Sequence, residues 1–163
     1  MLAKRRIAHA RGYLELGMLA EAAAELALVP EPENAGLGFQ GVRLALLQEQ
    51  QDWPALRDCA RDYAHRVPEE AAAWVTWAYA ARRADSITAA RKVLLEAIPH
   101  HPANGTIQFN LACYASQLGE LTDARHHLEL AIALDKEFAK AAVTDPDLAP
   151  LRDEKAGDER SGA

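Results

Sequence analysis

Two stretches of the sequence share one pattern although they lie far apart. They read Gly17-Met18-Leu19-Ala20-Glu21-Ala22 and Gly119-Glu120-Leu121-Thr122-Asp123-Ala124. In both, a glycine is followed two residues later by leucine and five residues later by alanine. The two glycines are separated by 102 residues, which is three times 34. This separation predicts an internal repeat of about 34 residues.

Residues that lie 34 positions apart are of the same kind, which supports the repeat. One position holds large apolar residues, namely Leu19, Trp53, Ile87 and Leu121. A turn position holds small or polar residues, namely Gly17, Gln51, Asp85 and Gly119. The second unit fits least well, because Leu44 and Leu56 replace the alanines of other units. Its first helix is therefore expected to begin late or to be shifted.

The helix-start and turn residues of each unit predict two helices. Asp52-Trp53-Pro54 has the chemistry of a helix start, and Pro68 and Pro102 separate neighbouring units. We expect helices at about 3–16, 19–29, 35–50, 53–66, 70–83, 86–98, 103–117 and 121–133, and a short ninth at about 137–144.

A helix–turn–helix unit of this length resembles the tetratricopeptide repeat (TPR). The fourth unit matches best, through Leu111-Ala112, Gly119, Leu121, Ala124, Leu128 and Ala131. The resemblance implies an all-α, right-handed superhelical solenoid of antiparallel helix pairs, with about eight helices and a short capping helix. Residues 1–152 would form a single array, with units at about 3–36, 37–70, 71–104 and 105–138, a cap at 139–152 and a disordered tail at 153–163.

Two segments of the array have specific expectations. In the C-terminal cap, Phe138, Val143, Leu148 and Leu151 are expected to cover the end of the last helix pair, because a solenoid must hide its terminal apolar face. Residues 30–36, which are rich in proline and glutamate, form either a hinge or a rigid turn.

The composition is that of a globular helical protein. The chain has 163 residues, of which 50% are hydrophobic, 26% are charged and 35 are alanine. No apolar run approaches the ~20 residues of a membrane helix, and the N-terminus lacks the apolar core of a signal peptide. Two cysteines fit a reducing compartment, so we predict a cytoplasmic protein. A net charge of −6 argues against nucleic acid as a partner, and no membrane association is expected.

The sequence contains no catalytic motif, so we predict neither an enzyme nor a cofactor or metal site. Adjacent histidines on a helix point ~100° apart, so the two pairs, His100-His101 and His126-His127, are interpreted as solvated surface residues. Cys113, Trp74 and Trp77 occupy positions expected to be packed. The basic N-terminus, Lys4-Arg5-Arg6 with Arg11, is a solvated helix face, a site for an anionic partner or a transit peptide.

The resemblance also implies where a partner would bind, because first helices line the concave groove of a TPR array. The predicted partner-binding residues are Arg11, Glu15, Gln48, Tyr79, Arg82, Arg83, Phe109, Cys113 and Gln117. Aromatic residues beside arginines favour an acidic–aliphatic segment. The carboxylate clamp of chaperone-binding TPR proteins is absent, since its positions hold Ile7, Arg11, Val42, Ala72 and Thr76.

We therefore predict a non-catalytic scaffold that binds a peptide or helix of another protein in this groove. The alternative is a structural protein that self-associates through the array ends or the convex face, in which case a homo-oligomer is expected.

Overall fold

The computed structural model describes residues 2–154, and this part of the chain is helical without a strand. Its α-helices are α1 (Leu2–Glu15), α2 (Leu19–Ala27), α3 (Leu37–Glu49), α4 (Trp53–Arg66), α5 (Ala71–Ala84), α6 (Ile87–Ala97), α7 (Gly105–Gln117), α8 (Leu121–Leu134) and α9 (Glu137–Thr144). Two 3₁₀ turns, η1 (Glu33–Ala35) and η2 (Pro146–Leu148), interrupt the connections. Residues 149–154 are also helical.

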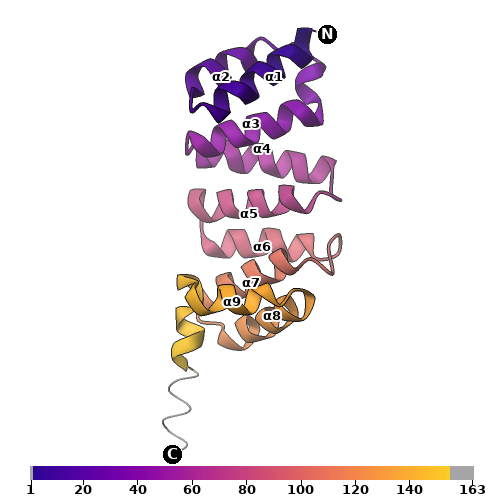
Figure 1. The fold of residues 1–163 in the computed structure, drawn as a ribbon. Coiled ribbons are helices and arrows are strands. Elements are labelled where there is room, and N and C mark those ends of the chain that lie inside the picture. The colour runs from indigo at the N-terminus through magenta and orange to yellow at the C-terminus, as the bar shows by residue number, and fades with distance from the viewer. Residues whose placement is uncertain (1, 155–163) are drawn as a thin grey trace, which may run out of the picture.

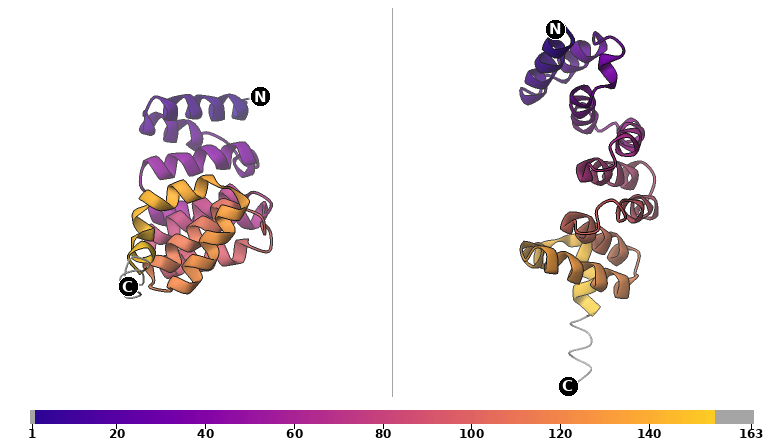
Figure 2. Two further views of the ribbon diagram at one scale, coloured as in Figure 1. Left: turned by 60° about the horizontal axis from the view of Figure 1, so that its bottom comes forward. Right: turned by 90° about the vertical axis from the view of Figure 1, so that its right-hand side faces the viewer.

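The helices stack in chain order, so that the two ends of the array lie far apart (Figure 1). Consecutive helices form antiparallel pairs, and Figure 2 shows the pairs layered along one curving stack. The predicted all-α solenoid is confirmed, and the helix ends differ from those expected by no more than two residues. Within residues 2–154, no helix combines the length and apolar character that a membrane crossing requires.

The turns inside three of the pairs require left-handed backbone at one repeat position. Gly17 and Gly119 have φ of 72° and 78°, which glycine adopts without a steric penalty. Gln51 takes the same place in the second unit with φ of 56°, so this turn is the least suited to its residue. Helix starts are capped by Asp52, Ser86 and Asn104, whose side chains accept backbone N–H bonds three residues ahead.

The array has two hydrophobic cores that meet at α3. The smaller core joins α1, α2 and part of α3, and includes Ala10, Leu26, Phe39 and Val42. The larger core starts at Leu44 on α3 and continues to the C-terminal cap. As the sequence suggested, the second unit is the irregular one: α3 begins only at Leu37, and its buried side chains are shared between the two cores.

The C-terminal residues fold back over the last helix pair. Leu148 and Leu151 are 1% and 8% exposed and belong to the larger core. Val143, expected in the cap, is instead 68% exposed. Residues 153 and 154, expected to begin a disordered tail, are helical, and Arg152 donates hydrogen bonds to two backbone carbonyls of the cap. The remainder of that predicted tail, 155–163, lies outside the described residues.

A series of ion pairs is formed by arginines that recur on the second helices at the repeat spacing. Arg57 binds Asp85 at 2.6 Å, Arg91 binds Asp123 at 2.9 Å, and Arg125 binds Glu154 at 2.6 Å. We call these three contacts the arginine ladder. Each one joins a second helix to the segment that follows the next first helix, so it holds neighbouring units together.

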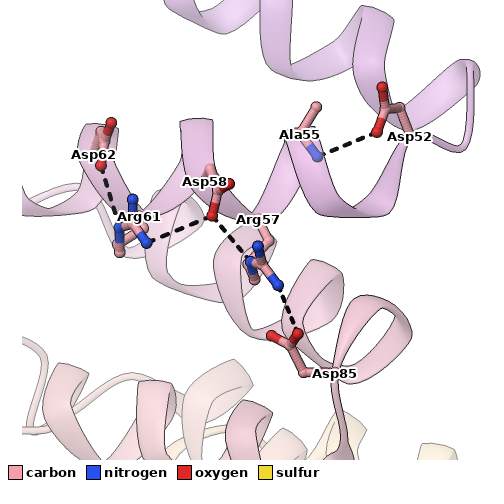
Figure 3. Close-up of polar contacts among 7 residues, drawn as sticks. All are labelled: Asp52, Ala55, Arg57, Asp58, Arg61, Asp62 and Asp85. Atoms are coloured by element: carbon pink, nitrogen blue, oxygen red, sulfur yellow. Dashed lines mark hydrogen bonds and ion pairs between the residues drawn. The ribbon is translucent and has the colours of Figure 1, made fainter.

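Figure 3 shows the first contact of the ladder, between α4 and the turn after α5. The same guanidinium donates to Asp58, and Arg61 donates to both Asp58 and Asp62. The hydrogen bond between Arg57 and Asp58 raises the pKa of the arginine and lowers that of the carboxyl. The equivalent position in the first unit is Ala23, so the ladder does not extend to α2.

Candidate partner-binding groove

The side of the array lined by α1, α3, α5 and α7, here called the first-helix face, is hollowed on both sides of α5. The hollow between α3 and α5 has a volume of about 280 Å³. Its lining includes small and polar side chains, among them Ala45, Gln48 and Thr76. A second hollow of about 380 Å³ lies between α5 and α7. Ala72 and Thr76, in the N-terminal half of α5, line both hollows, and we call the two hollows together the groove.

An arginine held by two aromatic rings lies further along α5. The guanidinium carbon of Arg83 is 4.4 Å from the ring centroid of Tyr79 and 4.8 Å from that of Trp53. The two rings meet edge to face with centroids 5.7 Å apart. Arg83 is exposed, and it takes part in no ion pair within residues 2–154. We call Arg83, Tyr79 and Trp53 the arginine cradle.

The neighbouring arginine has a different partner. Arg82 donates to both carboxylate oxygens of Asp147, with Nη2 2.9 Å from Oδ1. Gln117 donates to the backbone carbonyl of the same aspartate at 2.9 Å. The bond to Asp147 raises the pKa of Arg82. These two predicted groove residues therefore hold the chain's own C-terminal segment.

Two further predicted groove residues are covered. Phe109 is 9% exposed and stacks on Phe138 of α9 with centroids 5.0 Å apart. Cys113 is 3% exposed, and its burial beside Asp145 and Asp147 raises the pKa of the thiol to about 12. The cap packs against both residues, so their assignment to an accessible partner-binding groove is wrong, whereas Cys113 is packed as its repeat position predicted.

The structure also assembles a cluster that the sequence did not reveal. The potential ligand atoms of Cys113, Asp145 and Asp147 lie within 4.8 Å of one another. The cation beside this cluster is the guanidinium of Arg82. The cluster depends on the fold of the cap. Asp145 and Asp147 follow α8 and α9 in the sequence, and the cap returns them to α7, which carries Cys113.

The remaining predicted residues are divided between two helices. Gln48 on α3 lines the hollow between α3 and α5. Arg11 and Glu15 are exposed on α1 and occupy the repeat positions of Tyr79 and Arg83. They lie beyond α3, on the part of the array that has the smaller core.

One histidine of each pair departs from the predicted solvated surface, whereas His100 and His126 are exposed as predicted. His101 forms a 2.8 Å hydrogen bond with the carbonyl of Pro68, which also accepts from the indole of Trp74. His127 forms a 2.7 Å hydrogen bond with Gln108, and burial lowers the pKa of this histidine. Trp74 and Trp77 are buried, as predicted.

Comparison with known proteins supports the fold. The solved structure titled MamA MSR-1 C2, a TPR-like helical solenoid, is similar to this chain with a TM-score of 0.62. The likeness covers 98% of each chain at 13% sequence identity, so it shows the fold alone. Neither a protein-family model nor a curated protein matches the sequence.

The sequence did not identify Trp53 as part of this site. Trp53 occupies the large apolar position of the repeat, and this position is filled by ordinary packing residues in the other units. Its only distinguishing signal was its size, since the equivalent residues are Leu19, Ile87 and Leu121.

Proposed function

We propose that this chain is a divergent TPR array that acts as a non-catalytic scaffold and binds a segment of a partner protein on the first-helix face. The observation that carries the proposal is the arginine cradle, which lies on the same helix as the two hollows beside α5. Aromatic residues and arginine are the side chains that contribute most to protein interfaces. A cytoplasmic location and the absence of nucleic-acid partners remain predictions from the sequence.

The groove suits a peptide segment for a physical reason. Its walls are helices of a packed array, and the small side chains between them leave room for side chains of a ligand. The polar groups there are mainly hydroxyls and amides, such as Thr76, Thr106 and Gln48, which can satisfy a peptide backbone.

The test blocks the groove at the residue shared by the two hollows. Thr76→Arg places a long side chain between α3, α5 and α7, whereas Thr88→Arg makes the same change at an exposed position of α6. Proteins captured from a lysate by the wild type and by T88R should be at least about tenfold depleted with T76R, as measured by quantitative mass spectrometry. Equal capture by T76R, with helicity unchanged, would contradict the groove.

Self-association is a second candidate, and one feature favours it. A hollow of about 530 Å³ opens at the C-terminal end, lined within the described residues by α8, α9 and the last helical turn, including Ile132, Val143 and Leu151. If this end pairs with another copy, light scattering should show a mass that rises with concentration and that falls to the monomer in Val143→Glu. A monomer at all concentrations would dismiss this candidate.

A further inference from the structure

Two adjacent arginines on α5, Arg82 and Arg83, differ in whether a carboxylate of the chain binds them. Asp147 holds Arg82 through two contacts. Arg83 lies against Trp53 and Tyr79, and within residues 2–154 no acidic side chain pairs with it. Contacts with two rings restrict the arginine side chain, so a bound carboxylate would lose less conformational entropy on fixing it.

The hollow between α3 and α5 offers a second contact for a bound segment, and its distance from Arg83 follows from the helix geometry. Thr76 and Ala72, which line it, precede Arg83 on the same helix by about two and three helical turns. At about 1.5 Å per residue, these separations are roughly 10 and 16 Å. An extended segment advances about 3.3 Å per residue, so it would cover this distance in about three to five residues.

The lining of the hollow indicates what side chain it would receive. Leu44, Ala45 and Ala73 give it apolar surface, which suits an aliphatic side chain. Glu70 lies at the same hollow and would repel a second acidic residue there. The face therefore has a cation at one end and an apolar, acid-repelling pocket at the other.

We propose that the arginine cradle binds the carboxylate of an aspartate or glutamate in an extended partner segment, and that an aliphatic residue about three to five positions away enters the hollow between α3 and α5. This inference rests on the proposed scaffold function and adds the pattern of the ligand. The contact between Arg82 and Asp147 shows, in the same chain, how an arginine on α5 grips an aspartate with two hydrogen bonds.

The experiment uses the full chain and a random dodecapeptide library displayed on phage. Peptides selected on the wild type should carry an acidic residue about three to five positions from Leu, Ile or Val. The most enriched peptide is then synthesised with a fluorescent label, and its affinity is measured by anisotropy. Arg83→Gln should weaken binding at least about tenfold, and Arg83→Lys should weaken it less, because lysine keeps the charge but loses the two-pronged contact.

A matched control removes a positive charge elsewhere. Lys92 is exposed on α6, and Lys92→Gln should leave affinity within about twofold of the wild type. Selected peptides without an acidic residue, or unchanged affinity in R83Q, would overturn the inference. In either case, loss of binding in T76R would still support the groove of the proposed function. Failure of both variants to weaken binding, or a library without binders, would count against the groove as well.

Discussion

The N-terminal helices α1–α3 and the array from α4 to the cap follow the same repeat but are held together differently. The first region has a small core in which alanines and a few larger side chains, such as Leu26 and Phe39, are buried. The second buries Trp74, Leu94, Ile107 and Leu111 almost completely and carries the whole arginine ladder. The period thus places the helices in both regions, whereas the arginine ladder and the largest buried side chains belong to the second region alone.

The largest expected effect comes from removing the central side chain of the larger core. Trp74 is 1% exposed, and its indole donates to the carbonyl of Pro68 at 3.0 Å. Trp74→Ala should lower the free energy of unfolding by about 3–5 kcal/mol in urea denaturation followed by circular dichroism. Leu28→Ala, at a side chain that is 58% exposed, should cost less than about 0.5 kcal/mol.

The same variant tests whether the two cores open separately. In a repeat array each unit contacts only its neighbours, so hydrogen exchange in W74A should accelerate in α5 and α6 and change little in α1 and α2. Equal acceleration of exchange in α1 and α6 would show that the two cores unfold as one cooperative unit, which would contradict the distinction between the two regions.

A smaller effect is expected at the end of the larger core. Leu148→Ala removes a side chain that is 1% exposed and should cost about 2–4 kcal/mol in the same denaturation experiment. Val143→Ala, on the exposed side of α9, is the matched control and should change stability by less than about 0.5 kcal/mol. A similar cost for both variants would mean that the cap does not stabilise the last pair.

The smallest effect is expected from a substitution that extends the arginine ladder into the N-terminal region. Ala23 occupies the repeat position of Arg57, and Asp52 occupies that of Glu120, which pairs with Arg91. Ala23→Arg should add a few tenths of a kcal/mol relative to Ala23→Gln, which has a similar length without the charge. Identical stability of the two variants at low salt would show that the ladder geometry does not reach α2.

The repeat predicted most of the fold but only part of the site. Helix positions followed from a single period because the apolar and turn positions recur within each unit. The period also assigned Gln48, Tyr79 and Arg83 to first helices, and the structure has them on α3 and α5. It contained no information on Asp147, which reaches Arg82 across 65 residues, because that contact depends on how the cap turns after α9.

The cradle was partly hidden for a related reason. A repeat assigns each residue to a packing or surface position by analogy with the other units. Trp53 is both, since its ring packs against the larger core and also carries Arg83. Only the three-dimensional arrangement of α4 and α5 shows this double use.

The arginine ladder has a consequence for the evolution of this chain's length. Glu154 lies one repeat period after Glu120, and it meets Arg125 as Glu120 meets Arg91. The cap thus attaches to the fourth unit through the same kind of ion pair by which the fourth unit attaches to the third. A duplication of the fourth unit would therefore place a copy of Glu120 beside Arg125, and the added unit would be joined by the same kind of ion pair while the cap stayed the same.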